Sequence, residues 1–259
     1  MRAGNEAAVQ WLLAEGAPKE PVDVLSQVFG AAMAGDVATL EFMMQAGPAY
    51  VRDAFFSQML AHRAAIGGHA HVLEWMWHEY GWSAESHGVT AELLSAACTA
   101  GSFEILAWAR ERLGTGAAVW RELQPDHWGM LALTGSVAGV ELLAELGLPK
   151  PVDGSPFVRV VLHTGHRHAW WMLPALHRLG VPFGPACGEL LAACVACGAP
   201  LGTLRWLLAA GCPVDDWSEV EQALGRRRPG AGAREVQAWV REQREGQGPP
   251  SDVRPRQSS

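Results

Sequence analysis

Two stretches of the chain, GDVATLEFMMQAG at residues 35–47 and GSVAGVELLAELG at residues 135–147, align with each other without a gap. Both open and close on glycine, and both carry apolar side chains at helical spacing between the glycines. Residues 4–16 match the same pattern. Self-similarity of this kind indicates a repeat protein, in which one supersecondary unit recurs along the chain.

The two bounding glycines recur with one period along most of the chain. The opening glycines step by 31, 33, 33, 34, 30 and 33 residues, and the closing glycines by 31, 34, 33, 33, 33 and 31. This periodicity predicts about seven units of roughly 33 residues. The opening series is Gly4, Gly35, Gly68, Gly101, Gly135, Gly165 and Gly198, and the closing series is Gly16, Gly47, Gly81, Gly114, Gly147, Gly180 and Gly211.

Each unit is predicted to consist of two helices. The opening glycine ends the first helix in the left-handed conformation, and the next residue is often a helix N-cap. The closing glycine ends the second helix, and a proline commonly follows it. A single unit cannot bury its own apolar face, so the units have to stack. The expected fold is therefore an all-α helical repeat solenoid. The predicted N-caps are Asn5, Asp36, Ser102 and Ser136.

The repeat pattern divides the chain into three segments. Residues 1–216 are predicted to form the repeat array, with an incomplete first unit because residues 4–16 match only a second helix. We therefore expect the chain to be a fragment of a longer one. Residues 217–246 are predicted to be C-terminal capping helices with Trp239 packed inward, and residues 247–259 to be a disordered tail. Pro174 is predicted to kink the second helix of the sixth unit.

One segment resembles a known repeat family. His62-Arg63-Ala64-Ala65-Ile66-Gly67-Gly68-His69 is similar to the His-x-Ala-Ala-x-x-Gly-His core of the ankyrin repeat, and the following Val72-Leu73-Glu74-Trp75-Met76 resembles its second helix. The Thr-Pro-Leu that precedes the histidine in that family is absent. The array looks like the divergent ones of algae, protists and large viruses. The tetratricopeptide repeat has a similar period, but the Trp-Leu-Gly-Tyr-type first helix that it needs is not found.

Composition narrows the function classes. The chain has 49% hydrophobic residues, but no apolar run long enough to span a bilayer and no secretory signal at its start. We expect a cytosolic or nuclear protein. Residues 1–224 hold 12 basic and 23 acidic side chains, which argues against binding to a phosphate backbone. Neither a membrane nor a nucleic acid is an expected partner.

Two clusters invite a metal hypothesis. Cys194 and Cys197, with Cys187 and Cys212 nearby, are residue types of a zinc site. However, Cys194 and Cys197 occupy the small-residue positions of the repeat, which favours packing. A second cluster consists of His163, His166, His168 and His177. Solvated or capping histidines explain it more simply. No catalytic motif is found, so neither an enzyme nor a metal or other cofactor is expected.

The resemblance implies a protein-protein interaction scaffold or adaptor that binds its partner through the concave face and the inter-repeat loops. Large aromatic residues in the predicted connections, together with acidic neighbours, are the candidate binding residues, and the alternative is that these rings pack on neighbouring loops. The acidic body either favours a basic partner or keeps the surface soluble, and we expect a monomer. Alternatives are the substrate-recognition part of a larger ubiquitin-ligase adaptor and a Cys/His metal-binding protein. The candidates are Trp82, Trp120, Trp128, Phe183, Asp215, Asp216 and Trp217.

Overall fold

The computed structural model describes residues 21–46, 54–82, 89–162, 169–227 and 232–246. These residues are helical, with no strand among them. The chain divides into two compact units, residues 1–150 and residues 151–259. This division lies inside the segment that the repeat pattern assigns to one array. Within the described ranges, no helix is long and apolar enough to cross a membrane.

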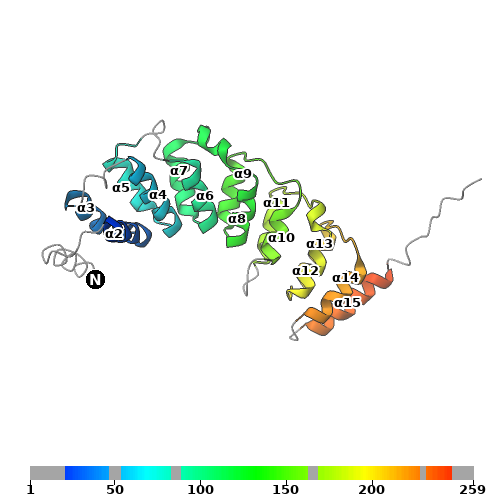
Figure 1. Cartoon of the computed structure of the whole chain (residues 1–259). Coiled ribbons are helices and arrows are strands. Elements are labelled where there is room, and N and C mark those ends of the chain that lie inside the picture. Colours follow the sequence, from blue (N-terminus) through cyan, green and yellow to red (C-terminus); the bar gives the residue numbers. More distant parts are fainter. Residues whose placement is uncertain (1–20, 47–53, 83–88, 163–168, 228–231, 247–259) are drawn as a thin grey trace, which may run out of the picture. The chain divides into compact units, whose positions relative to one another are not determined.

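The N-terminal unit consists of successive helix pairs (Figure 1). The first helices of the pairs contact one another in chain order, as α2 with α4, α4 with α6, and α6 with α8. Each first helix also packs on the second helix that follows it, and α5, α7 and α9 form a row of their own. The helices are α2 (Pro21–Ala34), α3 (Val37–Ala46), α4 (Ala54–Gly67), α5 (Ala70–Glu79), α6 (Ala91–Ala100), α7 (Phe103–Leu113), η2 (Ala118–Glu122), α8 (Asp126–Thr134) and α9 (Val137–Glu145).

The C-terminal unit repeats this contact pattern. Its first helices α10, α12 and α14 contact in chain order, and each packs on its following helix, α11, α13 or α15. The two last helices lie within the segment for which capping helices are predicted. The elements are α10 (Ser155–Leu162), α11 (Met172–Arg178), η3 (Pro185–Cys187), α12 (Leu190–Ala196), α13 (Leu201–Ala209), α14 (Trp217–Arg226) and α15 (Ala233–Gly246).

Small side chains allow the first helices to lie close together. Ala32, Ala64, Ala65, Ala97 and Ala132 are all fully buried where these helices meet. A side chain without a γ-carbon lets two backbones approach, and the leucines and valines around it fill the remaining space. The predicted small-residue positions are therefore core positions.

The two glycine series end helices as predicted. At Gly101 the backbone is left-handed, with φ of 71°, and the N–H contacts the carbonyls of Ala97 and Cys98 at the end of α6. Every described member of both series has positive φ. Left-handed backbone strains residues that have a Cβ, so glycine is the residue that ends these helices without cost.

Hydrogen bonds from two histidines connect neighbouring helix pairs. Nε2 of His69 lies 2.9 Å from the carbonyl oxygen of Met33, and Nε2 of His71 lies 2.9 Å from that of Gly35. Met33 lies in the last turn of α2 and Gly35 directly follows the helix, where backbone acceptors have no partner within the helix. His69, which follows the opening glycine Gly68, is thus a structural residue here.

The predicted caps are partly confirmed. Asp36 accepts the N–H of Thr39 at 3.1 Å, and Ser136 accepts that of Gly139 at 3.3 Å. Ser102 occupies the N-cap position of α7 as predicted, but its buried hydroxyl makes no capping hydrogen bond and has no partner among the described residues. Asn5 lies outside the described residues.

The sixth unit differs from its prediction. Pro174 is the third residue of α11, within the first helical turn. Backbone N–H groups of the first turn have no intrahelical acceptor, so proline is tolerated there and no kink is required. The helix is short because it begins late, at Met172.

The C-terminal helix has the predicted inward face. Val236, Trp239 and Val240 of α15 are buried, which confirms the expected orientation of Trp239. The predicted disordered tail, residues 247–259, and the incomplete first unit, residues 4–16, lie outside the described residues.

Candidate functional site

A groove runs along the outward face of α6 in the N-terminal unit. Its larger cavity has a volume of about 780 Å³. The floor is made by small side chains of α6, namely Ala91, Ser95, Ala96, Thr99 and Ala100. Residues four apart share one face of a helix, so Ala91, Ser95 and Thr99 form a low strip. The groove exists because taller side chains stand on both sides of this strip.

The two walls come from neighbouring first helices and from the connection before α8. His62 and Ile66 of α4 form one wall, and Glu122, Leu123 and His127 form the other. A second cavity of about 310 Å³ shares His62 and Glu92 with the first and extends along α4. Its other lining residues are Gln58, Met59, Arg63, Thr90 and Leu93. The two cavities together are called the α6 groove below.

The charges in the larger cavity are carboxylates. Glu92 and Glu122 line it and are exposed. The backbone N–H of Glu92 at the start of α6, and then the Thr90 hydroxyl, lower the pKa of the Glu92 carboxyl. Arg63 lines only the smaller cavity, and its guanidinium lies over the ring of Phe29, 5.5 Å from the centroid. The larger cavity therefore has negative potential at neutral pH.

His127 contributes an unsatisfied polar atom to the groove wall. The side chain is only 7% exposed, and its Nδ1 lies 2.8 Å from the backbone oxygen of Gln124. Its Nε2 is buried, and none of the residues that the structure describes forms a hydrogen bond with it. A buried polar atom without a partner costs about 1–3 kcal/mol, so it is rarely found without a structural or functional reason.

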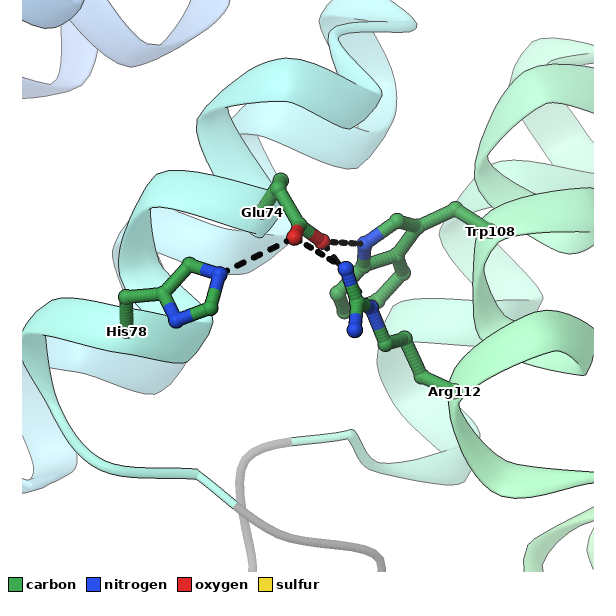
Figure 2. Close-up of polar contacts among 4 residues, drawn as sticks. All are labelled: Glu74, His78, Trp108 and Arg112. Carbon is green, nitrogen blue, oxygen red and sulfur yellow. Dashed lines mark hydrogen bonds and ion pairs between the residues drawn. The ribbon is translucent and has the colours of Figure 1, made fainter.

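A separate polar cluster lies on the second helices and surrounds Glu74 (Figure 2). Oε2 of Glu74 accepts the indole N–H of Trp108 at 2.8 Å and the Nε–H of Arg112 at 3.0 Å. Oε1 pairs with the other end of the Arg112 guanidinium and lies 3.0 Å from His78 Nε2. Trp108 and Arg112 belong to α7 and Glu74 to α5, so the cluster joins adjacent helix pairs.

These contacts stabilise the ionised form of Glu74. The Trp108 hydrogen bond contributes most to lowering the pKa of this carboxyl, while burial opposes it. Trp77 packs edge-on against Trp108 at 5.8 Å between centroids, and the Arg112 guanidinium lies 5.9 Å from the Trp77 ring. Both carboxylate oxygens of Glu74 are hydrogen-bonded, and the bonds from Trp108 and Arg112 connect α5 with α7.

Three of the predicted partner-binding aromatics are buried. Trp82, Trp120 and Trp128 are 8%, 2% and 0% exposed, so the expectation that they project from loops is wrong. Trp120 lies in η2, which turns back so that its indole donates to the carbonyl of Gly114 at 2.8 Å. Trp128 belongs to α8 itself, and Trp82 stacks on Tyr80.

The remaining predicted residues lie in the C-terminal unit. Phe183 is half-buried beside Phe157, His177 and Trp206, with ring centroids 4.6, 5.4 and 6.5 Å away. Its packing role is thus visible, and a partner contact is not needed to account for it.

The acidic candidates lie at the start of α14. Asp215 and Asp216 are exposed, and Asp216 accepts the N–H of Ser218 at 2.7 Å as the N-cap of the helix. Trp217 is the first helical residue and is half-buried. That these residues contact a partner stays a prediction.

The cysteines of the C-terminal unit are packed as apolar groups. Cys187, Cys194 and Cys212 are buried, Cys197 is half-buried, and all are free thiols. Burial raises the pKa of Cys194 well above its ordinary value. Among the described residues, no three His, Cys, Asp or Glu side chains are placed to hold a metal ion. His163, His166 and His168 lie outside the described ranges.

The α6 groove was missed by the sequence reasoning. The available signal was the strip Ala91, Ser95 and Thr99, polar or small at positions that face outward from the expected core. The depth of the groove comes from longer side chains on the neighbouring elements. The repeat spacing does not predict where those side chains lie relative to α6. No protein-family model matches the chain, and no curated protein shows significant sequence similarity to it.

Proposed function

We propose that this chain is a non-catalytic protein-interaction module of the ankyrin type, which binds a partner through the first-helix face of its N-terminal unit. Three features support the proposal: the period of about 33 residues, the stacked helix pairs, and the histidine and alanine pattern of residues 62–69. A cytosolic or nuclear location is part of it.

The α6 groove is the observation that carries the proposal. Cavities of a few hundred Å³ on a stacked helix face accommodate several side chains of a partner. Ile66, 38% exposed, and Met59, 37% exposed, provide apolar contact at its edge. Partly exposed apolar groups next to polar ones are typical of the centre of an interface, where a few anchors contribute most of the binding energy.

A groove-filling variant tests this proposal. Thr99→Trp places an indole on the floor of the groove, whereas Thr115→Trp makes the same change at an exposed position outside the groove. Each protein is used as bait in quantitative affinity purification with mass spectrometry, and the binding of the leading partner is then measured with purified components. We expect Thr99→Trp to lose the partner and Thr115→Trp to keep it. Equal binding by both variants would exclude the groove as the interaction surface.

The alternatives give different results with the same samples. Recovery of ubiquitin-ligase subunits by the wild-type bait would favour a substrate-recognition adaptor. Stoichiometric zinc in the purified protein would favour the metal-binding alternative, and it would have to bind residues outside the described ranges or rearrange the packed thiols.

A further inference from the structure

We infer that the α6 groove receives a cationic segment of the partner protein, with arginine or lysine side chains beside Glu92 and Glu122 and an apolar side chain between them. This inference rests on the proposed interaction function and specifies the chemistry of the occupant.

The lining of the larger cavity carries negative charge. Described residues around the larger cavity include the carboxylates of Glu92 and Glu122 and no lysine or arginine. His62 and His127 complete the titratable lining. A carboxylate beside a cavity with apolar walls attracts a cation more strongly than one on an open surface, because less water screens it.

Glu92 is the carboxylate shared by the two cavities, since it lines both of them. Its backbone N–H and the Thr90 hydroxyl lower its pKa, so the charged form is favoured at the start of α6. Glu122 lines the larger cavity from the wall that also contains Leu123 and His127. A cationic segment along the groove can therefore approach a carboxylate from α6 and one from η2.

The charge of the surrounding unit supports the same occupant. Residues 1–150 carry 17 acidic and 8 basic side chains, a net charge of −9, whereas residues 151–259 carry 10 acidic and 12 basic ones. The groove therefore lies in the acidic half of the sequence. A field of this sign accelerates the approach of a basic segment and disfavours an acidic one.

Apolar side chains line the larger cavity together with the two carboxylates. Ile66 belongs to α4, Ala96 and Ala100 belong to α6, and Leu123 follows η2, and these side chains provide contact for an aliphatic side chain of the occupant. His127, whose buried Nε2 has no hydrogen-bond partner among the described residues, lines the same cavity. An unpaired buried nitrogen is costly, so an occupant that bonded to it would remove that cost.

An acidic segment is the competing occupant. It would have to pair with Arg63, which lines only the smaller cavity and whose guanidinium already lies over the ring of Phe29. The two glutamates of the larger cavity would repel it. Geometry and charge both favour the cationic occupant.

The experiment uses the full chain and three fluorescent dodecapeptides that differ only in their core: Arg-Leu-Arg, Gln-Leu-Gln and Glu-Leu-Glu. Binding is measured by anisotropy for the wild type, for Glu92→Gln/Glu122→Gln, and for Glu41→Gln/Glu111→Gln. The last variant removes the same charge from exposed residues of α3 and α7 that do not line the groove. Circular dichroism checks that each variant is folded.

We expect the Arg-Leu-Arg peptide to bind most tightly and the groove variant to weaken it at least about fivefold, as for two charge-assisted contacts at a partly exposed site. The control variant should change affinity less than about twofold. An equal loss of affinity in the groove variant and the control variant would mean that only the overall charge matters, which would overturn the inference. So would preference for the glutamate peptide, or no binding of any peptide up to about 1 mM, which corresponds to about −4 kcal/mol.

Binding of the groove variants to the partner found by affinity purification distinguishes a failure of this inference from a failure of the proposed function. If Thr99→Trp abolishes partner binding while Glu92→Gln/Glu122→Gln does not, the groove binds a protein but not through a cationic segment. If neither variant affects the partner, the proposed interaction surface is itself wrong.

Discussion

The indole N–H of Trp108 donates a 2.8 Å hydrogen bond to Glu74, a residue 34 positions earlier in the chain. That separation is close to one repeat. The indole N–H on the second helix of one pair therefore has its acceptor on the second helix of the preceding pair. The bond is the largest contribution to the lowered pKa of Glu74. Contacts of this kind couple the stability of neighbouring units, as nearest-neighbour interfaces do in stacked repeats.

Glu74→Gln should lower the free energy of unfolding at pH 7 by about 1 kcal/mol. The figure is modest because Glu74 is one-third exposed and solvent screens its ion pair. The folded-state pKa is lowered from its ordinary value of 4.5, so the stabilisation is present above pH 4.5 and is lost as the pH falls through the folded-state pKa. Urea unfolding of both proteins at pH 7 and at acidic pH measures the difference.

The control for this prediction is Glu111→Gln, which neutralises an exposed carboxylate of α7. It should be nearly neutral at both pH values. A destabilisation by Glu74→Gln that persists unchanged in acid would mean that shape and packing, not charge, account for the loss.

Gly101→Val should cost more than strain alone. The left-handed backbone costs a β-branched residue on the order of 1–3 kcal/mol, and the added Cβ would also collide with the Thr134 side chain. Gly114→Val is also strained, at φ of 73° and ψ of 168°, but open space surrounds its Cβ, and Gly116→Val is in open space with no left-handed φ. We expect Gly101→Val and Gly114→Val both to destabilise more than Gly116→Val in thermal unfolding. A melting temperature unchanged by Gly101→Val would contradict the helix end assigned there.

Trp239→Ala should destabilise the C-terminal unit by about 3 kcal/mol, because it leaves a cavity beside Val236 and Val240. Gln237→Ala changes an exposed residue of the same helix and should stay within about 0.5 kcal/mol of the wild type. Hydrogen exchange of the C-terminal unit reports both effects locally. Equal protection in the two variants would show that α15 does not act as a cap.

The thiols should react in the order of their burial. Burial raises the pKa of Cys98 and Cys212 to about 12 and that of Cys187 to about 11, so little thiolate forms at pH 8. Cys197 is half-buried and should be alkylated first, with Cys194 protected until unfolding. Timed iodoacetamide labelling followed by peptide mass spectrometry gives the order. Labelling of Cys194 as fast as Cys197 would show that α12 opens readily.

Local features were predictable because they depend on neighbours in the chain. The left-handed glycines, such as Gly101, and the caps at Asp36 and Ser136 follow from backbone geometry within a few residues. Ser102 has the same position in the pattern and is the N-cap residue of α7, but its buried hydroxyl makes no cap hydrogen bond. The pattern therefore predicted the N-cap position but not the hydrogen bond.

The sequence by itself determined that the chain is helical, where many of its helices end, and which small residues lie at the helix contacts. These properties are set by the 3.6-residue period and by the conformational limits of glycine and proline. Tertiary structure alone decided which aromatics are exposed. Trp120 and Trp128 are buried by a 3-10 turn and by the start of α8 that no repeat spacing predicts. The tertiary structure also brings Glu92 and Glu122, which are 30 positions apart in the chain, to one groove. The groove is lined by side chains of α4, α6, η2 and α8, and its depth depends on how far these side chains extend once the elements have packed together.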